Sequence, residues 1–171
     1  MHALAGEPPI EKTVGERLRE HDATVAVAET VTGGMVTALL TAVPGASEYV
    51  DRGFVPYSYD SLREQTGVTR EELDAEGVVS EPVTRQLARR ARDVADATWG
   101  LATTGVAGPD GGTPDKPVGT THVAVAHAAP WGSERSHAAA ETHAFDGDRG
   151  TVRERSARAA LALLAERVAE S

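Results

Sequence analysis

The chain has 171 residues, the size of one ordinary domain, and 40% of them are hydrophobic, enough for a substantial core. A formal net charge of −9 argues against non-specific nucleic-acid binding, which requires a basic footprint. The chain has no cysteine, which excludes disulfides, thiolate metal sites and a cysteine nucleophile.

The balance of charged residues indicates the environment of the protein. Lys12 and Lys116 are the only lysines among 17 basic residues, beside 26 acidic ones. That balance is typical of a high-GC organism and, because an acidic surface stays hydrated when salt is high, of a halophilic one. No apolar run approaches the ~20 residues needed to span a membrane, and residues 1–12 lack the pattern of a signal peptide. We expect a soluble, cytoplasmic protein with no membrane or nucleic-acid partner.

Helices alternate with strands in the first half of the chain. Ile10, Val14 and Leu18 recur every four residues, which predicts an amphipathic helix at 8–22. Pro56 indicates that one strand lies at a sheet edge or a bulge. The predicted elements after the first helix are a buried strand at 24–28, a helix at 33–43, a strand at 53–58, and helices at 69–77 and 80–97.

The last two of these helices carry start signals. Thr69 and Glu72 form a capping box, and Gly77 ends that helix. The next helix has Ser80 as its cap and Pro82 in its first turn. Its predicted buried face consists of Val83, Leu87, Ala91 and Val94.

The second half predicts three strands and a closing helix. The strands are 99–108, 119–128 and 136–145, with a hairpin-like connection at 130–134. The helix at 148–171 has one apolar side, formed by Val152, Ala159, Leu163 and Val168. This order favours an α/β fold, a three-layer α/β/α sandwich around a mixed, mostly parallel sheet. We expect one domain over residues 1–171, with its core at about 10–169.

The first of three notable loops is ETVTGG, residues 29–34. Gly33 and Gly34 open a helix, where backbone N–H groups and the helix dipole favour an anion. Thr30 and Thr32 stand where a nucleophile or a phosphate donor would be placed. The alternative is an ordinary helix cap provided by Thr32.

Two further loops follow predicted strands. In residues 52–64, Tyr57 and Ser58 bring polar groups to a strand end, although ordinary strand-end polarity explains them equally well. Residues 103–120 form a long Gly- and Pro-rich loop that includes Lys116. A loop of that length inside a domain is usually functional or disordered. Its first part, TGVAG, resembles a second backbone cradle that closes over a ligand.

Neither the histidines nor the arginines add a second site. The predicted strands carry His122, His127, His137 and His143 without the close spacing of metal ligands, so we expect no metal site. The run RQLARRARD shares its helix with Glu81, Asp93 and Asp96, which indicates a solvated face.

Several segments in the right order resemble the C-terminal domain family of the competence/damage-inducible protein CinA, in its stand-alone form. The resemblance runs from about Gly15 to the C-terminus. Its segments are VAETVTGGM, DRGFVPYSYDSL, AEGVVSEPV, TTGVAGPDGGTPDKPVGT and FDGDRGTVRERSA. Larger members carry a molybdopterin-binding-like domain ahead of this one.

Characterised members of that family are nicotinamide-nucleotide amidases. The resemblance implies hydrolysis of the carboxamide of nicotinamide mononucleotide to nicotinic acid mononucleotide and ammonia, with no metal or organic cofactor. It implies a homodimer or larger homo-oligomer. The residues expected to bind the nucleotide, glycines of the loops among them, are Glu29, Thr32, Gly33, Gly34, Tyr57, Ser58, Thr104, Gly105, Ala107, Gly108, Lys116, Arg149 and Arg153. The two arginines suit a phosphate, which they hold bidentately.

The chain departs from the family pattern at its catalytic dyad of serine and lysine. Thr30 stands for the serine and keeps a hydroxyl, while Val31 replaces the next cysteine. Leu62 stands for the lysine and cannot accept a proton. Arg63 is a poor substitute because guanidinium stays protonated. The remaining candidate bases are Glu29, Asp60 and Lys116.

Three functions stay open at this point. The first is an amidohydrolase with Thr30 as its nucleophile. The second is a catalytically inactive module of the same fold that binds a pyridine nucleotide. The third is hydrolysis of a different substrate, either another amide or a nucleotide with another base, because Val31 and Leu62 make the site less polar.

Overall fold

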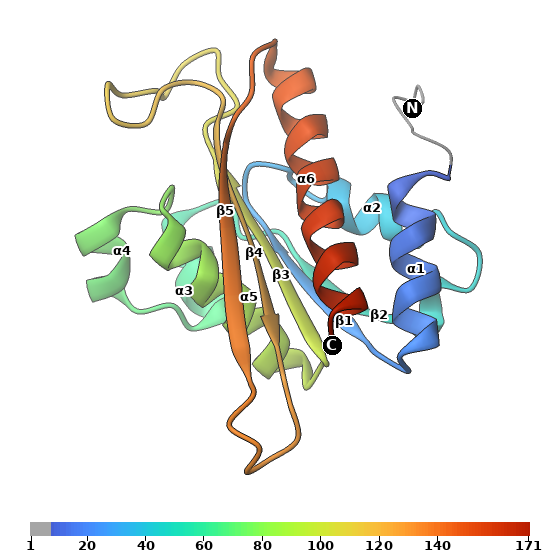
Figure 1. Ribbon diagram of the computed structural model, residues 1–171. Coiled ribbons are helices and arrows are strands. Elements are labelled where there is room, and N and C mark those ends of the chain that lie inside the picture. Colours follow the sequence, from blue (N-terminus) through green and yellow to red (C-terminus); the bar gives the residue numbers. More distant parts are fainter. Residues whose placement is uncertain (1–7) are drawn as a thin grey trace.

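The computed structural model describes residues 8–171 (Figure 1). The strands are β1 (Val25–Glu29), β2 (Val50–Phe54), β3 (Trp99–Gly105), β4 (Thr120–His127) and β5 (His137–Ala144). The helices are α1 (Ile10–Glu20), α2 (Met35–Thr41), α3 (Tyr59–Thr66), α4 (Arg70–Glu76), α5 (Glu81–Ala95) and α6 (Arg149–Ala169), with a short 3-10 helix, η1 (Ala46–Glu48).

One five-stranded sheet runs through the molecule in the order β2-β1-β3-β4-β5. β1 pairs in parallel with β2 and β3, whereas β4 pairs antiparallel with β3 and β5. Only β4 therefore runs against the other strands. The predicted mixed, mostly parallel sheet is confirmed.

Helices cover both faces of this sheet (Figure 1). β1 shows why both faces are apolar: Val25 and Val27 pack into the cluster under α1, α2 and α6, while Ala26 and Ala28 pack into the cluster under α5. Successive side chains of a strand point to opposite faces, so a strand buried on both sides needs an apolar residue at every position. The three-layer sandwich is confirmed.

The chain crosses from one face to the other around β1. α2 leads from β1 to β2 on the face of α1 and α6, and α5 leads into β3 on the opposite face. The connection after β1 thus runs toward β2 on one face, and the connection after β2 returns past β1 to β3 on the other face. In open α/β sheets such a switch point is where ligands bind.

Several sequence predictions change in detail. β2 is Val50–Phe54, earlier than expected, and Pro56 lies beyond it because proline cannot donate to a sheet ladder. The edge position of this strand is confirmed. Residues 59–66, expected as loop, form α3, which begins with a capping box between Ser58 and Ser61. Val94 was expected in the core but is 49% exposed, since the buried face of α5 continues through Ala95 instead.

Within residues 8–171, none of the helices combines the length and the apolar character that crossing a membrane would take. The expectation about a signal peptide concerns residues 1–12, most of which lie outside the described range.

Candidate active site

A cavity of about 240 Å³ lies at the carboxyl ends of β1 and β3. It brings together segments that are far apart in the sequence: the loop after β1, the start of α3, the turn before α5 and the end of β3. Its lining residues are Thr30, Val31, Pro56, Tyr57, Ser58, Tyr59, Leu62, Val78, Val79 and Gly105. Four of the expected site residues are thus neighbours here, namely Thr30, Tyr57, Ser58 and Gly105.

Glu29 organises the loop after β1. Its side chain is completely buried, and its two carboxylate oxygens accept five hydrogen bonds. Three come from the backbone N–H groups of Gly34, Val36 and Thr37, at 2.8–3.0 Å. The hydroxyls of Thr32 and Thr37 donate the other two, each at 2.7 Å. A carboxylate with this many donors stabilises the first turn of α2 in place of a neighbouring cap residue.

This arrangement changes two expectations about the loop. The N-terminal N–H groups of α2, expected to receive a ligand anion, already donate to Glu29. Thr32 does not cap α2 either, because its hydroxyl is bonded to Glu29 and to the hydroxyl of Thr103, both at 2.7 Å. Glu29 and Thr32 have no exposed surface. In this conformation they shape the loop and leave the cavity to Thr30.

Thr30 lines the cavity, and within residues 8–171 its hydroxyl is hydrogen-bonded to a backbone carbonyl and to no side-chain base. It donates to the backbone carbonyl oxygen of Thr103 at 3.1 Å. Leu62, which stands where the family lysine is expected, lines the same cavity and is 2% exposed. Of the bases considered from the sequence, Glu29 is engaged with its five donors, and Lys116 donates from Nζ to the carbonyl of Glu76 at 2.9 Å. Asp60 lies on the exposed first turn of α3.

Two arginines of α6 tie the three loops together. Arg149 donates from Nη1 to the carbonyl of Gly108 and from Nη2 to the hydroxyl of Tyr57, each at 2.8 Å. Arg153 donates from Nη2 to the carbonyl of Thr32 at 2.9 Å. The sequence placed these arginines on a phosphate. Here, part of each guanidinium is engaged with the loops that surround the cavity.

An apolar contact reinforces these ties. Val31 from the first loop, Ala107 from the third and Val152 from α6 form one buried cluster, against which Phe145 packs. The beginning of α6 therefore contacts all of the loops. Its N-cap is Asp148, whose carboxylate accepts from the backbone N–H of Thr151 at 2.8 Å. Hydrogen bonds from Thr151 hold the pKa of Asp148 below its ordinary value.

The other expected site residues lie at the margins. Thr104 is buried, shares a hydrogen bond of 2.7 Å with the hydroxyl of Thr84 in α5, and is not among the lining residues of the cavity. Ser58 accepts from the backbone N–H of Ser61 as the cap of α3. The sequence did not indicate that Tyr59, Val78 and Val79 line the cavity. For Val78 and Val79, the segment AEGVVSEPV, which matches the family, could have indicated it.

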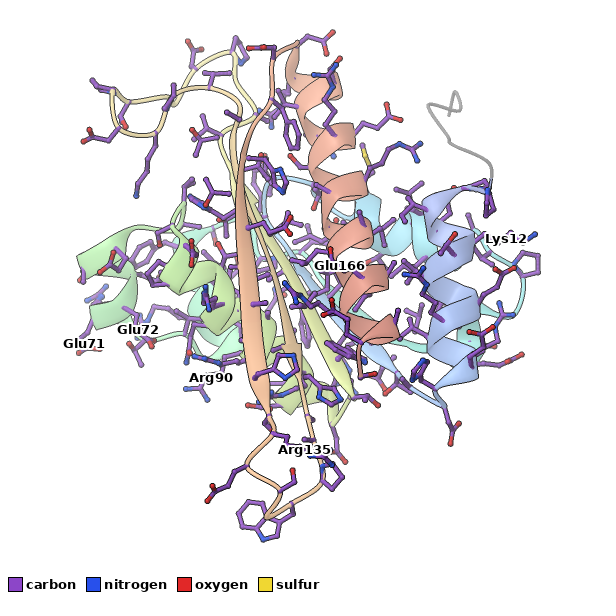
Figure 2. The ribbon with its side chains drawn as sticks, viewed as in Figure 1. Lys12, Glu71, Glu72, Arg90, Arg135 and Glu166 are labelled. Atoms are coloured by element: carbon purple, nitrogen blue, oxygen red, sulfur yellow. The ribbon has the colours of Figure 1, made fainter. Side chains whose placement is uncertain are left out.

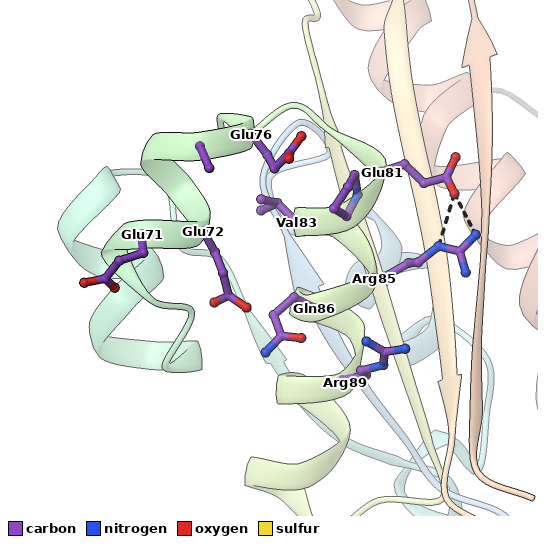
Figure 3. A pocket seen from close by; sticks show the side chains of 10 residues that line it. Glu71, Glu72, Glu76, Glu81, Val83, Arg85, Gln86 and Arg89 are labelled. Atoms are coloured by element: carbon purple, nitrogen blue, oxygen red, sulfur yellow. Dashed lines mark hydrogen bonds and ion pairs between the residues drawn. The ribbon is translucent and has the colours of Figure 1, made fainter.

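A larger groove of about 570 Å³ runs between α4 and α5 (Figure 3). Its acidic residues include Glu71, Glu72 and Glu76 on α4, and Arg85 on α5 is paired with Glu81 at 2.6 Å. None of the expected site residues lines it. Size alone does not identify the site in this molecule.

Comparisons with known proteins agree on one family. The sequence model of the CinA C-terminal domain matches residues 7–168. A CinA-like protein from Anaeromyxobacter sp. (strain K) is 48% identical over 159 residues, which is 93% of this chain and 37% of the relative. The chain thus spans well under half the length of that relative.

Solved structures agree in fold as well as in sequence. A CinA superfamily protein from Klebsiella pneumoniae superposes with a TM-score of 0.87 at 28% identity, covering 95% of this chain and 97% of that one. The competence/damage inducible protein CihA from Agrobacterium tumefaciens gives 0.83 at 33% identity, covering 96% and 97%.

Proposed function

Because this chain belongs to the CinA C-terminal domain family, we propose that its cavity binds a pyridine mononucleotide and hydrolyses the carboxamide slowly, with Thr30 as the nucleophile. The observation that supports this proposal is the position of Thr30, a hydroxyl-bearing residue that lines a cavity at the switch point of the sheet. The substrate class comes from the family resemblance.

The reaction needs few groups. The Thr30 oxygen attacks the carboxamide carbon, and the tetrahedral intermediate collapses with cleavage of the C–N bond. Ammonia leaves with the proton that the hydroxyl gives up, and a Thr30 ester remains. Water then hydrolyses that ester, which restores the hydroxyl and releases the carboxylic acid. The balance is one amide and one water for one acid and one ammonia.

The absence of a base sets the expected rate. The proton of Thr30 points to a carbonyl oxygen, which is too weak a base to remove it. The side chain of Leu62 has no atom that can accept the proton instead. General-base assistance is worth about 10²–10⁴-fold, so we expect turnover lower than that of a member with the lysine by roughly this factor.

The decisive measurement is ammonia release from nicotinamide mononucleotide, at low and at molar salt. We expect slow release by the unmodified protein, none by Thr30→Ala and an increase of about 10²-fold or more in Leu62→Lys. Leu62→Met, which fills a similar volume without a base, is the matched control and should behave like the unmodified protein. Unchanged turnover in Thr30→Ala would disprove its role.

A binding-only function is the second candidate. The observation that favours it is the hydrogen bond from the Thr30 hydroxyl to the Thr103 carbonyl, which directs the proton away from any leaving group. This candidate predicts calorimetric binding of nicotinamide mononucleotide with no ammonia, and release only in Leu62→Lys. If no pyridine nucleotide binds, both candidates fail.

The proposal extends to the setting of the protein. From the family resemblance we propose a homodimer or larger homo-oligomer that acts in the cytoplasm, in pyridine-nucleotide salvage. Light scattering on the purified protein tests the assembly. A monomer at micromolar concentration would contradict it.

A further inference from the structure

The end of the sheet opposite the candidate active site carries a row of three aromatic side chains. Trp99 of β3 pairs in register with His127 of β4, and His127 pairs with His137 of β5. Residues directly opposite one another on antiparallel strands project to the same face. The three rings therefore stand side by side across three strands, at the base of the β4–β5 hairpin.

The rings are close enough to act together. The ring centroids of His127 and His137 are 5.4 Å apart, and the indole of Trp99 lies 4.4 Å from the ring of His127. Two metal–nitrogen bonds of about 2.1 Å, at an angle near tetrahedral, place two imidazole centroids about 5 Å apart. The separation of these two histidines therefore suits one shared metal ion.

A hydrogen bond to the backbone fixes the orientation of the His137 ring. Its Nδ1 lies 3.1 Å from the carbonyl oxygen of Arg135. A carbonyl can only accept, so Nδ1 carries a proton, which leaves Nε2 as the nitrogen of this ring that can bind a metal. Metal-binding histidines are commonly fixed in this way by a backbone carbonyl on the other ring nitrogen.

We propose that His127 and His137 together bind one divalent transition metal ion of the kind that prefers imidazole, Cu²⁺, Ni²⁺ or Zn²⁺. Within residues 8–171 no three His, Cys, Asp or Glu side chains converge on a metal position. Water therefore completes the coordination, with space in the cavity of about 400 Å³ that both histidines line. We expect Cu²⁺ to bind tightest, as it does at most nitrogen sites.

The strand pairing explains why the sequence did not suggest this pair. His127 and His137 are separated by the hairpin, which is far from the short spacings of helical or loop metal motifs. Antiparallel register places them opposite each other. A bound ion would link β4 to β5, which is an edge strand of the sheet.

Tryptophan fluorescence tests the proposal directly. The chain has two tryptophans, and Trp131 at the hairpin tip is fully exposed. In a Trp131→Phe background, Trp99 is the only tryptophan and reports on the neighbouring His127. His2 lies outside the described residues and is replaced by alanine throughout, so that it cannot compete for the ion. We expect saturable quenching by Cu²⁺ that EDTA reverses.

Variants at the two strands separate this site from adventitious binding. His137 is exposed, so His137→Ala should fold normally, and we expect it to weaken the apparent Cu²⁺ affinity by about tenfold or more. His143→Ala, on the same strand, should leave the affinity unchanged. Zn²⁺ should raise the Tm of the background protein but not that of His137→Ala. Equal quenching in both variants, or quenching without saturation, would overturn the proposal.

Discussion

The loop after β1 and the segment after β2 reach the same cavity, but they contribute in opposite ways. The loop is held by a buried carboxylate, Glu29, with five hydrogen-bond donors. The segment after β2 provides a buried leucine, Leu62, where the family resemblance places a base. One wall of the cavity has a hydrogen-bonded polar framework, while the other has a buried apolar side chain at Leu62.

This difference separates the shape of the site from its rate of catalysis. Within residues 8–171, none of the hydrogen bonds that Glu29 accepts involves Leu62, so a change of residue at position 62 leaves these bonds in place. A site can therefore keep its shape while its rate falls by the amount that general-base assistance supplies. Three changes test the comparison, beginning with the framework.

Glu29→Gln should have the largest effect. The substitution keeps the shape but turns one acceptor oxygen into a donor that faces other donors, and buried polar groups without partners cost about 1–3 kcal/mol each. We expect the free energy of unfolding to fall by about 3 kcal/mol, measured by urea denaturation. Nucleotide binding should be lost as well.

Glu166→Gln is the matched control for this change. Glu166 lies on the exposed side of α6 (Figure 2) and should change the stability by no more than about 0.5 kcal/mol. If Glu29→Gln were as stable as this control, the carboxylate would not be what holds the loop, and the comparison would fail.

Arg149→Ala should have an intermediate effect. It removes the ties to Gly108 and Tyr57, which join the long loop to the segment after β2. We expect the affinity for nicotinamide mononucleotide to fall by about tenfold in calorimetry, because the loops must be ordered on binding. Arg155 is on the same helix and donates to the carbonyl of Asp146, which precedes that helix; Arg155→Ala should bind as the unmodified protein does. Equal affinities would show that the ties do not shape the cavity.

Asp148 should have the smallest effect, visible only through its pH dependence. Its pKa is below the ordinary 3.8 because Thr151 donates to its carboxylate. A lowered pKa in the folded state stabilises the protein above the unfolded-state pKa, and this stabilisation is lost as the pH falls through the lowered value.

Asp148→Asn separates the charge from the cap, because asparagine also caps helices but does not titrate in this range. The Tm difference between the unmodified protein and Asp148→Asn should be constant above about pH 5 and shrink as the pH falls below 4. A difference that is independent of pH would show that the charge contributes nothing.

The sequence predicted most of the fold because the apolar pattern is strong where elements are long or buried on both sides. The run at Val25–Glu29 and the four-residue spacing in α1 are examples. It missed α3, which buries only Leu62 and Thr66 and so lacks a visible stripe. Its capping box uses Ser61 in the place where a glutamate or glutamine is the usual signal.

The site was predictable as a set of loops but not as a set of contacts. Local patterns identified the segment around Thr30 and the glycine-containing segment TGVAG, from which Gly105 lines the cavity. They could not show that Glu29 faces inward to cap α2, nor that Arg153 bonds a loop carbonyl. Those roles depend on which side of the sheet α2 and α6 pack, and neither is written in a local pattern. The pairing of His127 with His137 depends on the register of β4 and β5, which a local pattern does not show either.

The position of the two arginines on α6 has a consequence for the order in which the site forms. Gly108, Tyr57 and Thr32 precede their arginine partners by 41, 92 and 121 residues. A domain generally folds as a unit, and contacts between residues far apart in the sequence form slowly. While the ribosome is still adding β4 and β5, the three loops are present but unlinked. The cavity therefore takes its final shape only when the last helix emerges and docks, so a polypeptide truncated before α6 would carry every lining residue and still lack the pocket.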